Sequence, residues 1–552
     1  MVPEQLRAEL ARVAASLGAP PGLVVELETP REKSHGDVAT NLALVLAKTL
    51  KAKPRDVAQR IVAALAFPPG LVASVEVAGP GFINFRLATD QLAGTLRAII
   101  AAGPRYGRSE EGGAAGQGRP VNVEFVSANP TGPLHVGHGR QAALGDAISS
   151  LLEWTGWKVT REFYYNDAGA QIAKLAASVQ ARIAELSGRR GEIPEGGYHG
   201  EYVRELAQRW LAAHPGDGGS DADAVRRFAV EELRREQDRD LQALSVRFDV
   251  YFLETSLYAD GRVEATVRRW REEGHTYETD GALWLRTTGY GDDKDRVVQR
   301  SEERGGEYTY FVPDVAYHVT KWQRGFTRAI DVQGADHHST VTRVRVGLRA
   351  LDLGIPEGYP EYVLHQMVTV MRGGEEVKIS KRAGSYVTVR DLVDEVGRDA
   401  VRYFFLMRKA DSHLQFDIDL ALKRSEENPV FYVQMAHARM SGIFRVGGVD
   451  AAAVTGDAVD VAVLTDESEA ELIKLLARFP DAVHRAAEAL DPQRITAYLE
   501  ELARAAHLWY HRCRVLGESE PVQRARLALA RATQIVLANA LALLGITAPE
   551  RM

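Results

Sequence analysis

The sequence predicts an α/β multidomain protein with a parallel sheet at its centre. The chain has 552 residues, which is too long for one compact core and favours roughly three or four domains. A strand–turn–helix–strand pattern covers residues 121–165, as expected where a parallel sheet begins. From Pro429 onward, nearly every stretch has the apolar spacing of amphipathic helices, which indicates a separate all-α domain.

Residues 1–107 have the pattern of a small α+β unit. Helices are expected at about 38–50 and 54–65, followed by strands at 74–77 and 82–87. The glycine-rich residues after this unit, 109–120, have the composition of a linker.

The central part starts with a βαβ pattern. Residues 121–126 have strand character, residues 129–133 form a turn with two prolines, and residues 136–154 have helical spacing. Residues 157–165 return to strand character, so we expect parallel pairing with the first strand.

The remaining central residues alternate between the two kinds of structure. Residues 170–275 are strongly helical and highly charged, and we interpret them as a solvated helical insertion. Strand-like stretches at 281–286, 308–312 and 328–333 indicate that the same sheet then resumes.

A helix is expected after Thr388, which forms a capping-box pattern with Asp391, and Gly397 is placed to end it. We therefore divide the chain into four parts: 1–107, an α+β domain; 108–385, a domain with an insertion at about 170–290; 386–428, a connecting segment; and 429–552, an all-α helical bundle.

Composition limits the cellular setting. The chain is 45% hydrophobic and 26% charged, as in ordinary globular proteins. No uninterrupted apolar run approaches the roughly 18–20 residues that span a bilayer, and the charged N-terminal stretch is unlike a signal peptide. The single cysteine, Cys513, excludes an intramolecular disulfide and a cysteine-rich zinc site. We expect a cytoplasmic protein without structural zinc or a membrane partner.

The formal net charge is −7. This value argues weakly against a nucleic-acid partner, but it does not exclude one, because binding depends on local basic patches.

The first motif that indicates chemistry is His135-Val136-Gly137-His138, at the start of the expected helix. Helix N-termini expose unpaired N–H groups and favour phosphate. The two imidazoles add donors about one turn apart, and Gly137 lets a flat ring such as adenine lie close to the backbone. The alternative is a pair of unrelated surface or capping histidines.

The second motif is Lys378-Ile379-Ser380-Lys381-Arg382, which follows a strand-like stretch and the pair Gly373-Gly374. The double glycine suits a tight hairpin turn with positive φ. A cationic loop there would stabilise the charge that builds on a triphosphate during nucleotidyl transfer. Taken alone, a solvated basic turn is the simpler interpretation.

Together, in this order, the two motifs resemble the HIGH and KMSKS motifs of class I aminoacyl-tRNA synthetases. The departures are Val136, Ile379 and Arg382, of which the last keeps the loop cationic. The resemblance implies a Rossmann-like catalytic domain, ATP with Mg²⁺, and no further metal site. It also implies catalytic roles, which fall on His135, His138, Lys378 and Lys381.

A site for a guanidinium group should offer carboxylates in forked geometry. Glu124 lies on the strand before the turn, towards its carboxyl end, and Asp314 lies on what we take as the second half of the sheet. Ligands of open α/β sheets bind at the carboxyl ends of strands, where these halves would meet. By itself, a lone strand glutamate is more often an ordinary exposed residue.

Residues 123–138 resemble, in detail, the HIGH region of arginyl-tRNA synthetases. The segments 33–37 and 79–84 are similar to the N-terminal domain of that family, and 432–439 and 525–552 to its helical anticodon-binding domain. The resemblance therefore implies an arginine–tRNA ligase that uses L-arginine, ATP and tRNA-Arg, and we expect a monomer.

The resemblance also implies site residues. Those for arginine are Glu124, Asn129, His135, Tyr310, Asp314 and Asp336. Those for ATP are His135, Gly137, His138, Lys378, Ser380 and Lys381. The neighbourhood of Asp336, Asp336-His337-His338, also has the composition of a metal site, but we favour the family interpretation.

Candidate tRNA contacts lie at both ends of the chain. Phe82 and Asn84 combine an aromatic ring with an amide, as in sites for unpaired bases, although Phe82 suits a core equally well. In the C-terminal part the candidates are Tyr432, Gln434, Arg439, His511, Arg512 and Arg514.

Two alternatives remain. Another HxGH nucleotidyltransferase, such as a cytidylyltransferase-like enzyme, would be shorter and would lack the helical C-terminal domain. A synthetase-like tRNA-binding or regulatory protein without catalysis would not be expected to keep both motifs intact.

Overall fold

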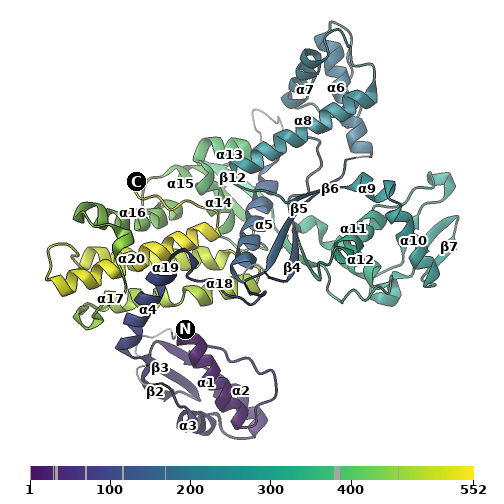
Figure 1. The fold of residues 1–552 in the computed structure, drawn as a ribbon. Helices are drawn as coiled ribbons and strands as arrows, with labels where there is room; N and C mark the ends of the chain where they lie inside the picture. Colours follow the sequence, from purple (N-terminus) through teal and green to yellow (C-terminus); the bar gives the residue numbers. More distant parts are fainter. Residues whose placement is uncertain are drawn as a thin grey trace.

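The computed structural model describes residues 2–28, 30, 35–68, 71–114, 117–167, 169–377, 386–457 and 459–552. Three parts are distinct in Figure 1: an N-terminal α+β unit, a central sheet with two excursions, and a C-terminal helical bundle. The α/β multidomain fold predicted from the sequence is confirmed.

The N-terminal unit is a three-stranded antiparallel sheet covered by helices. Its strands, in the order β1-β3-β2, are β1 (Val38–Thr40), β3 (Phe82–Leu87) and β2 (Val72–Ala78). Its helices are α1 (Val2–Ser16), α2 (Leu42–Leu50) and α3 (Pro54–Ala64). The helix expected from residue 38 therefore starts later, because residues 38–40 pair with β3 instead.

The central sheet has five parallel strands in the order β11-β10-β4-β5-β6. They are β4 (Pro120–Glu124), β5 (Lys158–Tyr165), β6 (Val250–Leu253), β10 (Arg328–Gly334) and β11 (Glu361–His365). Helix α5 (Val136–Trp154) connects β4 to β5, as expected for a βαβ unit. Strands from both halves of the domain thus meet at the β4–β10 pair.

The first excursion is a three-helix insertion that projects away from the sheet, and we call it the helical hairpin (Figure 1). It comprises α6 (Ala170–Leu186), α7 (Glu201–Ala213) and α8 (Ala222–Ala243). The prediction of helix throughout 170–275 was wrong, because the chain returns to the parallel sheet as β6.

The second excursion contains α9 (Glu254–Ala259), α10 (Arg262–Glu272) and a separate antiparallel sheet. That sheet is formed by β7 (Thr276–Thr279), β8 (Ala282–Leu285) and β9 (Arg296–Gln299). The expected strand at 281–286 exists, but it does not belong to the parallel sheet. The expected strand at 308–312 is wrong, since α11 (Phe311–Gln323) begins there with Pro313 in its first turn, where proline is tolerated.

After α12 (His338–Arg349) and β11, the chain forms a hairpin of β12 (Val368–Arg372) and β13 (Glu375–Glu376). Gly373 and Gly374 have φ of 58° and 80°, so the expected two-glycine turn is confirmed. Strand β14 (Leu414–Asp417) pairs with β12 in parallel.

The helix expected after Thr388 is α13 (Val389–Val396), and its capping box with Asp391 is confirmed, as is its end at Gly397. Two short helices follow, α14 (Arg398–Leu406) and α15 (Ile418–Leu422).

The C-terminal bundle contains α16 (Pro429–Gly447), α17 (Glu467–Ala477), α18 (Phe479–Glu488), α19 (Gln493–Arg512) and α20 (Glu520–Leu543). Among the described residues, α20 is the one helix long and apolar enough to cross a membrane, which no uninterrupted apolar run in the sequence indicated. Most of it is buried inside the bundle, as in the core helix of a globular domain.

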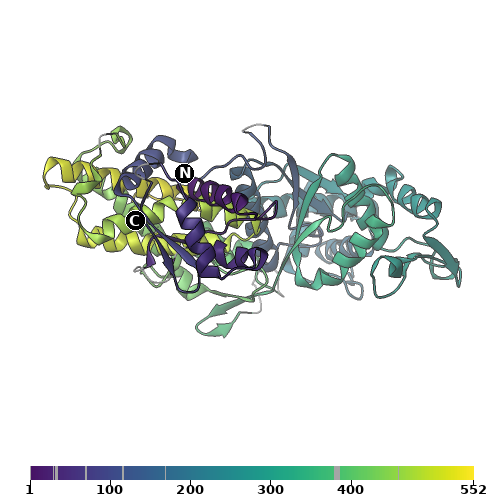
Figure 2. The same cartoon turned by 90° about the horizontal axis from the view of Figure 1, so that it is seen from below.

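The N-terminal unit lies against this bundle. From below, it is seen in front of the bundle, away from the β7–β9 sheet (Figure 2). Lys474 on α17 binds Asp37 at 2.6 Å, and Arg485 on α18 donates to the carbonyl of Leu27 at 2.6 Å. The helix between the two units, α4 (Thr89–Ala102), packs on α17 and α20.

Candidate functional site

The HVGH motif lies at the start of α5, as predicted. His135 is the N-cap residue, and its Nδ1 accepts hydrogen bonds from the backbone N–H groups of Gly137 (3.1 Å) and His138 (3.3 Å). His135 thus already occupies two of the unpaired N–H groups that the sequence suggested for phosphate. Because Nδ1 accepts, the neutral ring carries its proton on Nε2 and can donate from there.

The two imidazoles are stacked, with ring centroids 3.6 Å apart. Burial lowers the pKa of His135, although Asp336 opposes this effect. Burial also lowers the pKa of His138 well below its usual value, and His135 and His365 add to that effect. Both rings are therefore neutral donors at pH 7, and they contribute no positive charge.

A cavity of about 510 Å³ opens beside this pair. One wall is the turn before α5, and another is the start of α7 and the loop before it, with Tyr198, His199 and Tyr202. Tyr386 closes it near His135, with ring centroids 5.8 Å apart. Its described lining offers imidazole, amide and hydroxyl groups, and no carboxylate.

The second motif lies outside the described residues, because these stop at Val377 and resume at Tyr386. This applies to Lys378, Ser380 and Lys381. The segment after the gap is tied to the first motif, since Val136 N–H donates to the carbonyl of Val387 at 3.2 Å.

Glu124 lies where the sequence placed it, at the carboxyl end of β4, and is only 5% exposed. It is not free: Lys321 on α11 donates to its Oε2 at 2.6 Å, and Ser127 donates to its Oε1 at 2.8 Å. A guanidinium group at Glu124 would therefore share this carboxylate with a buried ammonium.

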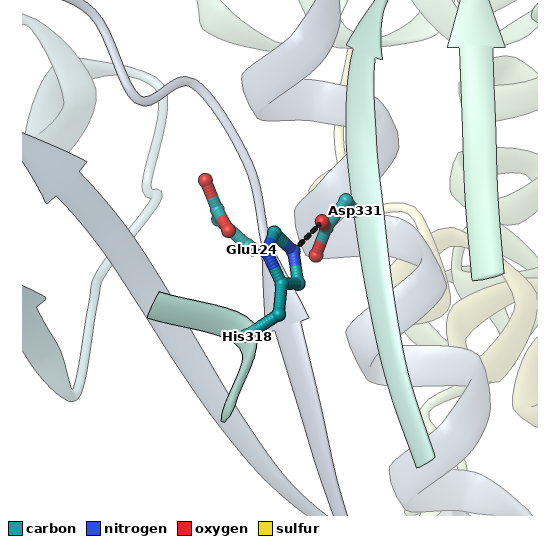
Figure 3. Close-up of side chains that lie close together, drawn as sticks. All are labelled: Glu124, His318 and Asp331. Atoms are coloured by element: carbon teal, nitrogen blue, oxygen red, sulfur yellow. Dashed lines mark hydrogen bonds and ion pairs between the residues drawn. The ribbon is translucent and has the colours of Figure 1, made fainter. Parts of the chain in front are cut away.

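Glu124, His318 and Asp331 converge as a metal site would (Figure 3). However, the ammonium of Lys321 donates to Asp331 at 2.7 Å as well as to Glu124, so it already supplies the cation there. His318 Nε2 lies 2.6 Å from Asp331 Oδ2. Burial would lower the pKa of Lys321, but Asp331 and Glu124 outweigh it and raise the pKa. These residues do not fit a metal ion.

Asp314 lies in the first turn of α11, and not on a strand as predicted. Burial raises its pKa to about 7, with neighbouring carboxylates adding to the effect and His318 opposing it. These carboxylates are Glu254, Glu124 and Asp331. Asp314 shares one face of α11 with His318 and Lys321, at spacings of four and seven residues, and these two side chains contact Asp331 and Glu124.

The other residues predicted to bind arginine are more exposed or have partners of their own. Tyr310 is the N-cap residue of α11 and is 70% exposed. The amide of Asn129 donates to Gln171 on α6 at 2.8 Å. Asp336 is an exposed residue beyond β10, and its charge opposes the lowering of the His135 pKa by burial.

Neither N-terminal tRNA candidate is freely exposed. Phe82 and Asn84 lie on β3, on the sheet face opposite the core residues Ile83 and Phe85. Phe82 is half-buried and Asn84 is buried.

The C-terminal candidates divide into two groups. Arg439, His511, Arg512 and Arg514 line one surface cavity of about 960 Å³, together with Tyr510, Arg551 and Met552. Gln434, in contrast, is buried and donates to Asp399 at 2.9 Å and to the Thr547 carbonyl at 3.0 Å. The amide donors of Gln434 are therefore used inside the protein, and its role as a tRNA contact stays a prediction. The ring of Tyr432 packs 4.5 Å from that of His507.

Sequence reasoning missed Lys321 and His318, which complete the acidic cluster. They lie one helical turn apart on α11, whose first two residues were predicted as the end of a strand and whose remaining residues were assigned no structure. With the correct helix, the spacing of these residues would have indicated one shared face.

Comparisons with known proteins agree with this architecture. The family model "tRNA synthetases class I (R), catalytic domain" matches residues 107–417, "Arginyl tRNA synthetase N terminal domain" matches 3–87, and "DALR anticodon binding domain" matches 433–552. With the parallel sheet and the HVGH helix, these matches define a class I aminoacyl-tRNA synthetase. The chain belongs to the arginyl-tRNA synthetase family.

Two relatives illustrate the match over the full length. The "Arginine--tRNA ligase" of Geobacter metallireducens is 56% identical over 542 residues, covering 96% of this chain and 95% of the relative. That of Bordetella avium is 54% identical over 571 residues and covers all of both chains.

Solved structures show the same fold. A putative arginyl-tRNA synthetase from Campylobacter jejuni has a TM-score of 0.78 at 31% identity, covering 84% of this chain and all of its own. The arginyl-tRNA synthetase of Thermus thermophilus has a TM-score of 0.79 at 23% identity, covering all of both chains.

Proposed function

We propose that this arginine–tRNA ligase converts L-arginine and Mg·ATP to arginyl-adenylate and pyrophosphate, and then transfers the arginyl group to the 3′ end of tRNA-Arg for protein synthesis. The observation that carries this proposal is the carboxylate of Glu124 at the end of β4, which is contacted by the same face of α11 that carries Asp314. A permanently cationic, planar substrate headgroup suits a pair of carboxylates.

Asp314 and Glu124 bind the guanidinium group, with Asp314 as the principal partner because Lys321 already shares Glu124. Asn129 and His135 hold the α-amino and carboxylate end, and Tyr310 lines the entrance. Asp336 acts near this end through its effect on His135.

ATP lies against Gly137 and His138, and Lys378, Ser380 and Lys381 bind its phosphates. Mg²⁺ enters as the partner of the triphosphate, since the described cavity lining offers no carboxylate to hold it. The donors of the two neutral imidazoles bind phosphate oxygens without adding charge.

The arginine carboxylate attacks the α-phosphorus and pyrophosphate leaves. The terminal adenosine of tRNA then attacks the carbonyl of the adenylate through its 2′-hydroxyl, and AMP leaves. Catalysis rests on positioning and on charge stabilisation, with no covalent bond to the enzyme.

The tRNA contacts two surfaces. Its anticodon binds the cavity lined by Arg439, His511, Arg512 and Arg514, whose charge and aromatic neighbour Tyr510 suit unpaired bases. The tRNA elbow contacts the N-terminal domain, residues 1–107, near Phe82 and Asn84. Tyr432 packs against His507 and so supports α16 beside the cavity. The enzyme acts as a monomer in the cytoplasm.

The test is to charge unfractionated tRNA with each of the twenty amino acids, using the purified full chain. We expect arginine alone to be attached, with arginine-dependent pyrophosphate exchange when tRNA is present. Attachment of another amino acid would contradict the substrate assignment. Binding of tRNA without any exchange would instead indicate a synthetase-like protein that has lost catalysis.

A further inference from the structure

The turn between β4 and the HVGH helix is held by a glutamine from the helical hairpin. Gln237 on α8 is 1% exposed, and its Nε2 donates to the carbonyl of Asn129 at 3.1 Å and to that of Gly132 at 2.9 Å. One buried amide thus spans the turn from its first residue to its fourth.

Two tyrosine hydroxyls bind two further carbonyls of the turn. Tyr202 on α7 donates to Thr131 at 2.9 Å, and Tyr386 donates to Pro133 at 3.0 Å. The inner face of the hairpin is therefore not solvated, and the interpretation of residues 170–275 as a solvated insertion was wrong at this face.

The turn needs such external partners. Pro130 and Pro133 have no N–H to donate, so the turn has few internal hydrogen bonds. Just before it, Val126 and Ser127 have φ of 70° and 42°, a left-handed conformation that is unfavourable for both side chains. A segment with this backbone keeps its shape only when its surroundings hold it.

We propose that Gln237 is a positioning residue for the activation of arginine. By fixing the carbonyls of Asn129 and Gly132, it sets the direction of the Asn129 side chain and the entry of the chain into His135. This inference rests on the proposed function of those two residues. It assigns the helical hairpin the task of keeping the activation site in its productive geometry.

The size of the effect follows from the geometry. Without the Gln237 donors, two buried carbonyls lose their partners, and the turn must shift to reach water or another donor. A shift of about 1 Å at a reacting group can cost about 100-fold in rate. The effect should appear in the binding of arginine as well as in turnover.

The experiment compares Gln237→Leu with Gln242→Leu in the full-length enzyme. Gln242 lies on the same helix, but it is exposed and its amide donates to Asp238 on that helix at 2.7 Å. Arginine-dependent pyrophosphate exchange with tRNA present gives kcat and the KM for arginine, and fluorescence anisotropy gives the Kd for tRNA.

For Gln237→Leu we expect kcat/KM for arginine to fall about 10- to 100-fold, with a raised KM, and the tRNA Kd to stay within about twofold of wild type. Gln242→Leu should match wild type. A purely structural role would lower kcat alone, in proportion to the loss of folded enzyme. That result, or equal kinetics for the two variants, would overturn the proposal.

Tyr202→Phe covers the case in which Gln237→Leu does not fold, because it removes one hydroxyl and keeps the ring. It should raise the arginine KM a fewfold at unchanged tRNA affinity, and an unchanged KM would count against the proposal. Wild-type enzyme that does not activate arginine would contradict the proposed function itself, and the two failures are thereby distinguishable.

Discussion

Among single residues, Asp314 has the most informative titration. Its pKa is raised to about 7 in the ligand-free protein, first by burial and then by neighbouring carboxylates. Because this folded pKa exceeds the ordinary value, ionisation of Asp314 costs folding free energy as pH rises from about 4 towards 7. Binding of a guanidinium group, which stays charged throughout, would recover that cost by pairing with the carboxylate.

We therefore expect the arginine KM to rise as pH falls below about 7, approaching tenfold per pH unit, because arginine must then displace a proton. Asp314→Asn should raise the arginine KM at pH 8 far more than the ATP KM, and should abolish this pH dependence. The measurement is the arginine KM of both proteins between about pH 5.5 and 8. A pH dependence that survives in Asp314→Asn would assign it to another group.

At the scale of elements, the sequence predicted structure well where the local pattern itself determines it. The helix at 136–154, the two-glycine turn and the capping box at Thr388 depend on residues close in the chain, and each is confirmed. Segments whose state depends on distant partners were predicted less well. Residues 308–312 resemble a strand over five positions. The helix α11 becomes evident only from the buried face that continues to Gln323.

The same distinction applies to the site. The carboxylate of Glu124 could be placed at a strand end from its local pattern, whereas its pairing with Lys321 depends on a contact 197 positions apart in the chain. Gln434 was assigned from its local sequence, and Gln237 was not assigned at all. Their hydrogen-bond partners, Thr547 and Gly132, lie about 113 and 105 positions away in the chain.

The capping box at Thr388 lies beside the HVGH motif. Thr388 is fully buried, its hydroxyl accepts from the Asp391 N–H at 3.0 Å, and the residue bridges to His135. Thr388→Ala should weaken the first turn of α13 by about 1 kcal/mol, whereas Thr388→Ser should keep the bond. Amide hydrogen exchange in residues 389–396 should then become about fivefold faster in the alanine variant only. Equal exchange in both variants would show that the cap does not stabilise this helix.

At the scale of the whole molecule, the C-terminal segment, residues 544–552, runs from a contact with the catalytic domain to the arginine-lined cavity of the bundle. Leu544 accepts from the buried Arg402 of α14 at 2.7 Å, and the same guanidinium binds Asp146 of the HVGH helix at 2.6 Å. His437 Nδ1 lies 2.9 Å from the carbonyl of Pro549, so this segment is held against α16. The next residues, Arg551 and Met552, line the arginine-rich cavity.

This arrangement predicts that tRNA binding and arginine activation can be changed separately. Arg551 lines the cavity, and Arg551→Ala should weaken tRNA binding about tenfold and reduce its salt dependence by about one phosphate contact. The arginine KM at saturating tRNA should stay constant, because Arg551 lies on the cavity side of the anchored segment. Arg524→Ala is the control, since Arg524 lies in the same bundle, is exposed and does not line the cavity. Titrations at several salt concentrations would decide the matter: an unchanged slope for Arg551→Ala, or the same loss in both variants, would contradict a phosphate contact in this cavity.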